Sequence, residues 1–205
     1  MRSRRAGSGG EESRALAARL RIIGGELRGR TIQYNGDPGL RPMKDRVREA
    51  VFNLVGPSVR DRHVVDLFGG TGAMAFEALS RGARHGVIIE RKFPNVRVIE
   101  ETAAELGLQE RLTILAGDAF RWAPRHVPTI PGPWVVFCCP PYEFFVSRRR
   151  EMLTLISTLW EHAGPGSVVV VEGDERLPVE ELPAEGDWDV RPYPPAVIAL
   201  ARREA

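Results

Sequence analysis

The sequence predicts an α/β fold with a mostly parallel β-sheet and an antiparallel last strand. Short runs rich in Val and Ile alternate with stretches of helical periodicity, and near-continuous apolar runs are typical of strands covered on both faces. Strands separated by helices favour a parallel sheet with right-handed crossovers. The chain has 205 residues, of which 43% are hydrophobic, so it can bury one core of ordinary size.

The expected elements follow one another regularly from His63 onward. The expected strands are HVVDLF (63–68), GVIIE (86–90), LTILAGD (112–118), PWVVFCC (133–139) and SVVVVEGD (167–174), and the expected helices cover 73–83, 93–108 and 148–164. The Pro-rich stretch 124–133 is expected to be a loop. DWDVRPY (187–193) and AVIALARRE (196–204), joined by two prolines, are expected to close the sheet as an antiparallel pair.

The front of the chain is basic. Residues 1–60 carry 13 Lys or Arg against 6 Asp or Glu, although the net charge of the whole chain is only +2. Residues 1–20 mix Arg, Gly, Ser and Glu, and we expect them to form a disordered extension. RIIGGELRGRTIQY (21–34) predicts a short two-stranded hairpin, and LRPMKDRVREAVFNLVG (40–56) predicts a helix. The expected organisation is therefore an extension at 1–20, a basic hairpin and helix at 21–60, and a main α/β domain at 61–205.

A folded platform of basic side chains suits a phosphate backbone, because counterion release favours each contact without reading the base sequence. Solubility alone would explain the same charge equally well. Two arginines after the strand at 133–139 are further candidates for phosphate contacts. The candidate RNA-binding residues are Arg21, Arg28, Arg30, Arg41, Lys44, Arg46, Arg48, Arg148 and Arg149.

Composition argues against several classes of protein. The chain has no long apolar run, so we expect neither a signal peptide nor a membrane span and place the protein in the cytoplasm. Its two cysteines are adjacent, which suits neither a disulfide framework nor a metal site, and its four histidines show no ligand spacing. We therefore expect reduced thiols, no metal and a monomer.

Acidic residues and glycines stand where the predicted strands end, and ligands of open α/β sheets bind at those ends. Gly70-Thr-Gly72-Ala-Met-Ala75 fits the dinucleotide pattern G-x-G-x-x-G/A, so a nicotinamide enzyme is one alternative. Asp66, however, would repel a pyrophosphate and instead suits a cationic amino-acid group. Asp118 ends the third strand, and a Pro-Pro-Tyr sequence ends the fourth.

Together these features predict a pocket for S-adenosylmethionine. Asp66 and the glycine turn would hold the methionine part, Glu90 the ribose hydroxyls and Asp118 the adenine amino group. The candidate cofactor-binding residues are Asp66, Phe68, Gly69, Gly70, Thr71, Gly72, Glu90, Arg91, Asp118 and Ala119.

Several motifs carry a resemblance to a known family. They are Arg21-Ile-Ile-Gly-Gly, Arg28-Gly-Arg30, Leu40-Arg-Pro, Asp45-Arg-Val-Arg-Glu, Phe52-Asn53, Asp66-Leu-Phe and Glu77-Ala-Leu-Ser-Arg-Gly-Ala83. In these the chain resembles the RsmD family, bacterial methyltransferases that act on a guanine N2 of 16S ribosomal RNA. The resemblance implies a Rossmann-like class I methyltransferase sheet of seven strands at 61–205, with S-adenosylmethionine as cofactor. It also implies 16S rRNA or a small-subunit assembly intermediate as partner, docked by the basic hairpin and helix at 21–60.

The candidate catalytic residues are Cys139, Pro140, Pro141 and Tyr142. The family carries Asp or Asn before the two prolines, whereas this chain has Cys139. An oxygen at this position and the Pro140 carbonyl would hold the hydrogens of the amine and free its lone pair, and Tyr142 would stack on the base. A neutral thiol is a weak acceptor, and a thiolate would compete for the methyl group.

A methyltransferase for another exocyclic amine, such as adenine N6 of DNA or RNA, is a further alternative, because the Pro-Pro-Tyr sequence suits any such amine. Three interpretations of Cys139 follow. The protein methylates a guanine N2 in spite of the thiol; it is a catalytically impaired module that binds the cofactor or RNA; or the thiol serves a different substrate. We favour the first interpretation, because the predicted cofactor residues are all present.

Overall fold

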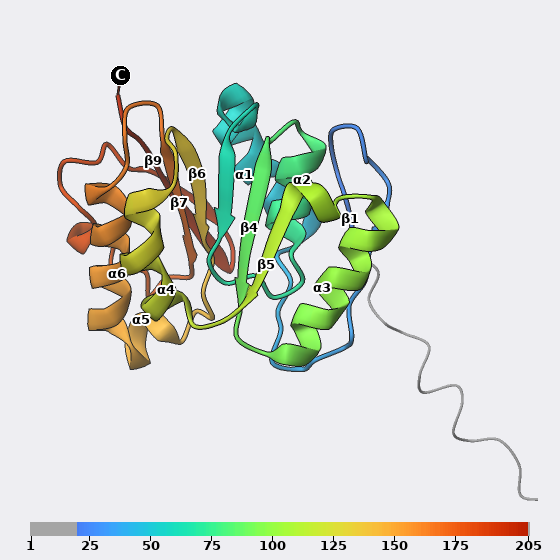
Figure 1. Cartoon of the computed structure of the whole chain (residues 1–205). Coiled ribbons are helices and arrows are strands. Elements are labelled where there is room, and N and C mark those ends of the chain that lie inside the picture. Colours follow the sequence, from blue (N-terminus) through green and yellow to red (C-terminus); the bar gives the residue numbers. More distant parts are fainter. Residues whose placement is uncertain (1–19, 205) are drawn as a thin grey trace, which may run out of the picture.

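The computed structural model describes residues 20–204, so the expected extension lies outside the described residues except for Leu20. Its seven-stranded sheet has the order β5-β4-β3-β6-β7-β9-β8 (Figure 1). Strands β3 to β7 are parallel, and β9 is antiparallel to both of its neighbours, which confirms the predicted sheet. The strands are β3 (His63–Asp66), β4 (His85–Glu90), β5 (Leu112–Ala116), β6 (Trp134–Cys138), β7 (Val168–Gly173), β8 (Asp189–Tyr193) and β9 (Ala196–Arg202).

Helices cover both faces of this sheet, because alternate residues of each central strand point to opposite sides. In β6, Val135 and Phe137 pack under α1, α2 and α3, whereas Trp134 and Val136 pack under α4, α5 and α6. Figure 1 shows these two groups of helices on either side of the sheet. The helices are α1 (Asp45–Val55), α2 (Ala73–Ser80), α3 (Phe93–Leu106), α4 (Ala119–His126), α5 (Phe144–Ser147) and α6 (Arg149–Glu161), with 3₁₀ turns η2 (Gly56–Val59), η3 (Gln109–Arg111), η4 (Val127–Thr129) and η5 (Val179–Glu181).

Helix α4 corrects the prediction of a loop at 124–133. Pro124 lies inside this helix, and Val127–Thr129 continue as the 3₁₀ turn η4. The carboxylate of Asp118 caps the start of α4 by accepting hydrogen bonds from the backbone N–H groups of Phe120 and Arg121, at 2.9 and 3.3 Å. Pro124 removes one backbone hydrogen bond from this helix, because proline has no N–H.

The predicted hairpin is present but short, since β1 (Leu20–Arg21) and β2 (Thr31–Ile32) have two residues each and pair antiparallel. Ile22 and Ile32 are fully buried and pack into the same core as α1, α2 and the near face of the sheet. The basic front of the chain and the main sheet therefore share one hydrophobic core.

Arg48 lies in this core with no exposed surface. Its guanidinium donates hydrogen bonds to the carbonyl oxygens of Arg21 and Met43, at 2.5 and 3.2 Å, and to the carboxylate of Asp45 at 3.0 Å. The Nε atom lies 3.7 Å from the carboxylate of Glu77. A guanidinium enclosed in this way cannot reach a phosphate, so the structure contradicts the predicted RNA contact of Arg48.

Glu77 joins the hairpin to α2. Its carboxylate is fully buried and accepts hydrogen bonds from the backbone N–H groups of Ile23 and Gly24, both at 2.8 Å, and from Nε of Arg81 at 2.7 Å. This carboxylate forms ion pairs with Arg48 and Arg81 and accepts hydrogen bonds from two backbone groups of the hairpin. We therefore regard Glu77 as the attachment point of the hairpin.

Candidate active site

The predicted site residues lie at the carboxyl ends of four neighbouring strands. Asp66 ends β3, Glu90 ends β4, Asp118 follows β5 and Cys139 follows β6. This edge of the sheet lies at the bottom of Figure 1, where α3 begins and where α5 lies. The fold thus brings together residues that are up to 73 positions apart in the chain.

Asp66 has no positively charged partner among the described residues. The side chain is 1% exposed, and neither carboxylate oxygen accepts a well-aligned hydrogen bond from those residues. Burial raises the pKa of Asp66 to about 8, the charge of Glu90 adds to this effect, and the nearby backbone N–H groups of Ala75 and Phe68 oppose it. An unpaired polar group is costly in a protein interior, so a cationic ligand group would complete this site. The ammonium of a methionine moiety has that charge, and Asp66 therefore fits S-adenosylmethionine.

The glycine turn after Asp66 is shaped largely by packing. A Cβ atom on Gly69 would lie 2.3 Å from the side chain of Ile88, and Gly70 and Gly72 have φ angles of +56° and +74°. The N–H of Gly70 donates a 2.8 Å hydrogen bond to the carboxylate of Glu90. These contacts explain the glycines without a ligand, so the cofactor roles of Gly69, Gly70, Thr71 and Gly72 stay predictions.

Glu90 is held by the backbone around it. In addition to Gly70, its carboxylate accepts a 2.7 Å hydrogen bond from the N–H of Lys92 and a long one of 3.4 Å from the amide of Asn95, and the side chain is 8% exposed. A carboxylate can accept about four hydrogen bonds, so capacity remains for ribose hydroxyls. Arg91 and Ala119, the neighbours of Glu90 and Asp118, differ in exposure: Arg91 is exposed and Ala119 is buried.

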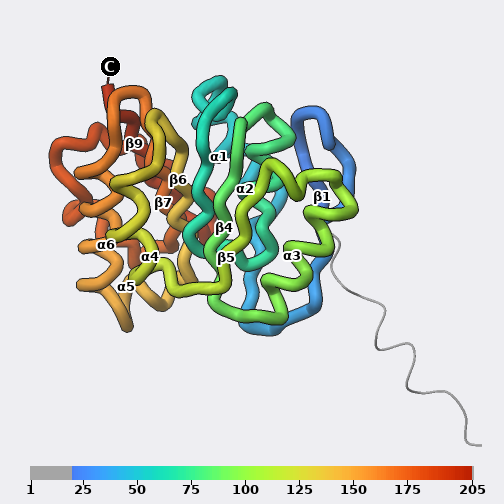
Figure 2. The backbone as a smooth tube through the Cα atoms, viewed as in Figure 1, coloured from blue at the N-terminus to red at the C-terminus, as the bar shows by residue number. Residues whose placement is uncertain are grey.

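The segment that joins β2 to α1 runs along the same edge of the sheet. Asp37 forms a 2.6 Å ion pair with Lys92, and the amide of Asn35 donates a 2.9 Å hydrogen bond to Asn95. In Figure 2 this segment, in blue, passes beside the start of α3. The contacts bring the loop before α1 next to the predicted cofactor residues.

Three aromatic rings gather beside Asp118. Phe68, Phe120 and Phe144 follow β3, β5 and β6, and their ring centroids are 5.8 to 6.3 Å apart. The guanidinium of Arg148 lies 3.8 Å from the centre of the Phe120 ring and 4.0 Å from the Asp118 carboxylate. Flat apolar surfaces next to a carboxylate suit the adenine of the cofactor. Of these rings, the sequence indicated only Phe68 as a cofactor contact.

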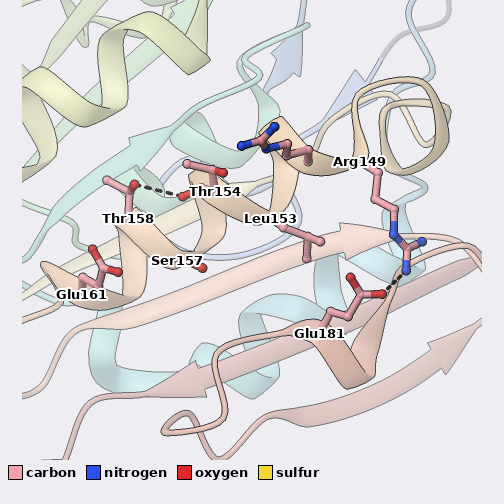
Figure 3. A pocket seen from close by; sticks show the side chains of 8 residues that line it. Arg149, Leu153, Thr154, Ser157, Thr158, Glu161 and Glu181 are labelled. Carbon is pink, nitrogen blue, oxygen red and sulfur yellow. Dashed lines mark hydrogen bonds and ion pairs between the residues drawn. The ribbon is translucent and has the colours of Figure 1, made fainter.

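The two arginines predicted to bind RNA beyond β6 are engaged by acidic side chains. Arg148 donates hydrogen bonds of 2.9 and 2.6 Å to Glu151, and Arg149 pairs with Glu181. Arg149 and Glu181 also line a pocket of about 550 Å³ on the outer face of α6 (Figure 3). This pocket contains no predicted cofactor or catalytic residue and is a separate feature from the strand ends.

Strand β6 ends at the predicted catalytic residues. Cys139 is partly exposed, Pro140 is buried, Pro141 is exposed and Tyr142 is half-buried. Burial raises the pKa of Cys139 well above its ordinary value, and the charges of Glu172 and Asp66 raise it further. The thiol is therefore neutral at physiological pH, which removes the expected competition between a thiolate and the target amine.

The hydroxyl of Tyr142 donates a 2.7 Å hydrogen bond to the carboxylate of Glu172, the penultimate residue of β7. Burial and the charge of Glu172 raise the pKa of this hydroxyl, so it stays protonated. The bond fixes the outer end of the ring that we expect to stack on a base. Glu172 was missed in the sequence, because its position beside Cys139 depends on the pairing of β6 with β7.

The remaining basic candidates are exposed but lie at two opposite edges of the sheet. Arg46 donates to the carbonyl of Pro194 at the end of β8, on the edge with the site residues, and Arg41 and Lys44 precede it in the chain. Arg30 donates to the carbonyl of Glu105 near the end of α3, on the opposite edge. The exposed candidates are Arg21, Arg28, Arg30, Arg41, Lys44 and Arg46.

Within residues 20–204, no helix is long and apolar enough to cross a membrane. In the same part of the chain, no three His, Cys, Asp or Glu side chains are grouped as metal ligands.

The sheet order and the strand-end residues define a methyltransferase with a Rossmann-like fold. A solved structure from Escherichia coli with the name "Putative methyltransferase yhhF" matches with a TM-score of 0.73 and 29% identity over 91% of this chain and 99% of that chain. The family model described as Conserved hypothetical protein 95 matches residues 20–188. The chain belongs to this family, the RsmD family.

Two relatives carry the name Ribosomal RNA small subunit methyltransferase D. The protein of Escherichia coli strain K12 is 38% identical over 103 residues, which cover 50% of this chain and 48% of that protein. The protein of Haemophilus influenzae is 29% identical over 163 residues, which cover 78% of this chain and 81% of that protein.

Proposed function

We propose that this protein transfers a methyl group from S-adenosylmethionine to the exocyclic N2 of a guanine in 16S ribosomal RNA. The observation that carries the proposal is the buried carboxylate of Asp66, without a charged partner among the described residues, on the strand next to the one that Pro140-Pro141-Tyr142 follow. The first feature suits the ammonium of the methyl donor, and the second suits a planar amine on a base. The names of the two relatives support ribosomal RNA as the substrate.

Each part of the site has a role in this proposal. Asp66 would pair with the ammonium of the donor, Glu90 with its ribose and Asp118 with its adenine amino group. When bound, S-adenosylmethionine supplies a methyl group on a positively charged sulfur. The Pro140 carbonyl would accept a hydrogen of the target amine, and Tyr142 would stack on the base and hold it in place.

Transfer to RNA can be tested directly. The protein is incubated with S-adenosylmethionine labelled in the methyl group and with unmethylated 16S rRNA, either naked or in small-subunit particles, and the labelled nucleotide is mapped. We expect label on the N2 of one guanine. Label on adenine N6 would favour the alternative amine, and binding of the donor without any label would favour an impaired binding module.

The position of the target base predicts which basic residues contribute most to RNA binding. Because a base at Tyr142 must enter at the carboxyl edge of the sheet, we expect its flanking phosphates to contact Arg41 and Lys44, which stand in the chain between Leu40, beside Gly70, and Arg46, bonded to Pro194. Exchange of both for Ala is expected to weaken RNA binding by roughly 10-fold or more and to lower the slope of log affinity against log salt by about 1 to 2. Filter binding at several salt concentrations measures both quantities.

The matched control is the pair Arg28→Ala and Arg30→Ala, which removes the same charge at the opposite edge. We expect a smaller effect from this pair. Equal losses from the two pairs would contradict docking at the carboxyl edge and would indicate an RNA surface that spans the molecule.

A further inference from the structure

The end of β7 lies directly beside Cys139. Cys138 pairs with Val171 in the parallel ladder of β6 and β7, so the next residues, Cys139 and Glu172, are neighbours across the two strand ends. Phe137 and Val170, two residues earlier, both pack into the core under α1 and α2. Since alternate residues share a face, Cys139 and Glu172 project to that same side of the sheet.

Glu172 is an acidic side chain without a positive partner. It is 7% exposed, and one of its oxygens, Oε1, accepts the 2.7 Å hydrogen bond from Tyr142. Within residues 20–204, no Lys, Arg or His forms an ion pair with it. A hydrogen bond from the neutral thiol of Cys139 lowers the pKa of this carboxyl, so the thiol lies against the carboxylate. A carboxylate can accept about four hydrogen bonds, and this one, buried and contacted only by neutral donors, stands beside the position where the family carries an oxygen.

We propose that the carboxylate of Glu172 accepts a hydrogen of the target amine in place of the Asp or Asn oxygen that Cys139 replaces. This inference rests on the proposed function and names a further catalytic residue for it. The lone pair of the amine nitrogen forms the new N–C bond while the S–C bond breaks and its electron pair stays on sulfur. The nitrogen then carries a positive charge and releases one proton, which Glu172 accepts and passes to solvent.

The protonation states around the site agree with this assignment. Burial raises the pKa of Glu172 to about 7, against the lowering effects of the Tyr142 hydrogen bond and of Cys139, so the carboxyl can lose and gain a proton near neutral pH. The titratable groups that face it are Tyr142, Cys139 and Asp66. Its partner on β9, Ile198, is uncharged. Tyr142 and Cys139 stay protonated in this pH range, which leaves Glu172 as the acceptor.

Single-turnover methylation of 16S rRNA particles with saturating labelled S-adenosylmethionine tests the proposal. Glu172→Gln keeps the size of the side chain and is expected to lower the rate by roughly 100-fold, by analogy with the loss of one oxyanion-hole group. Affinity for S-adenosylmethionine, measured by calorimetry, should not change. The wild-type rate should fall below a pH of about 7, and this fall should be absent in Glu172→Gln. Glu180→Gln, an exposed exchange of the same kind, is the control and should leave the rate unchanged.

Two more variants distinguish two possible roles of Glu172, as the acceptor of the amine hydrogen or only as the group that holds the Tyr142 ring. Tyr142→Phe removes the hydrogen bond to Glu172 but leaves its carboxylate, and we expect a smaller loss than from Glu172→Gln. In the otherwise wild-type protein, Cys139→Asp should change the methylation rate by less than about 3-fold, because an acceptor is already present. In the Glu172→Gln variant, the same exchange should raise the methylation rate by at least about 10-fold.

Three results would overturn the assignment. One such result is an equal loss of rate in Glu172→Gln and Tyr142→Phe, with the rate of Glu172→Gln still falling at acid pH. It would show that Glu172 only holds the ring of Tyr142 in place. A rise of roughly 100-fold from Cys139→Asp alone would show that the wild-type site lacks an acceptor. A wild-type protein that binds S-adenosylmethionine but labels no guanine would instead refute the proposed function, and this result is visible before any variant is made.

Discussion

Exchange of Asp66 for Asn is expected to weaken the binding of S-adenosylmethionine by roughly 100-fold. A hydrogen bond between charged groups contributes about 1.5 to 3 kcal/mol, and within residues 20–204 the buried carboxylate of Asp66 has no charged partner. Asn keeps the shape of the side chain but loses its charge. Isothermal titration calorimetry gives the affinity, with the exposed exchange Asp187→Asn as control. Unchanged affinity in Asp66→Asn would remove Asp66 from the cofactor site.

The same exchange should have a different effect on folding than on cofactor binding, because burial of the Asp66 carboxylate lowers the free energy of unfolding. The pKa of this carboxyl is raised to about 8 in the folded protein, above its value in the unfolded chain. The folded state therefore holds more protons between a pH of about 4 and 8, and the free energy of unfolding falls as pH rises through this range, by at most about 1.4 kcal/mol per pH unit for one group.

Urea denaturation of the protein without ligand, at several pH values, should show a shallower fall in Asp66→Asn than in the wild type. Glu172, with its pKa of about 7, adds a similar slope below neutral pH, so the difference due to Asp66 is clearest between pH 7 and 8. If Asp66→Asn is less stable than the wild type at pH 8, the side chain has a partner that the structure does not show.

Exchange of Glu77 for Ala is expected to lower the free energy of unfolding by about 3 to 5 kcal/mol. Removal of Glu77 leaves Arg48, which has no exposed surface, with the half-exposed carboxylate of Asp45 as its one charged partner among the described residues, and loss of a buried partner is strongly destabilising. The backbone N–H groups of Ile23 and Gly24 also lose their acceptor. Urea denaturation gives the magnitude, and faster hydrogen exchange at these two amides would locate the damage in the hairpin.

Two further variants make this prediction specific. Glu100→Ala, an exposed exchange on α3, should cost less than about 1 kcal/mol. The double exchange Glu77→Leu with Arg48→Met replaces the buried charges by apolar groups and should recover much of the loss. A loss below about 1 kcal/mol in Glu77→Ala would show that the hairpin is held mainly by its apolar contacts.

The strands of the main sheet could be predicted because their composition leaves few alternatives. Val168 to Val171 are four consecutive β-branched residues bounded by polar ones, and each predicted strand overlaps an observed one. Helix α4 was missed because Pro124 usually marks a helix boundary, and the compensating cap by Asp118 involves only short-range contacts that a proline rule ignores. Local sequence patterns thus sufficed for the sheet but not for a capped helix with an internal proline.

The burial of Arg48 could have been predicted from its position in the helix, but the basic charge of the segment led to another interpretation. It precedes the buried residues Val51 and Phe52 by three and four positions, which places it on the buried face of α1. The number of basic residues in the segment suggested a phosphate surface instead. Burial of Arg48 also depends on Glu77, whose proximity no local pattern reveals.

The residues of the candidate site at the strand ends could be predicted from the sequence, but the contacts between them could not. The residues at the ends of β3 to β6 follow from the strand pattern, since parallel strands end at one edge. The missing partner of Asp66, the aromatic neighbours of Asp118 and the position of Glu172 beside Cys139 depend on register and packing between segments far apart in the chain.

The attachment of the hairpin by Glu77 has a consequence for how RNA would be bound. Because Ile22 and Ile32 lie in the core of the sheet, this stretch becomes ordered when the protein folds and not when RNA arrives. RNA that docks here would meet a preformed surface, and association would carry little entropy loss from the protein. The heat capacity change of binding should accordingly reflect the contact area alone, without the large negative contribution that accompanies the folding of a disordered arm on nucleic acid.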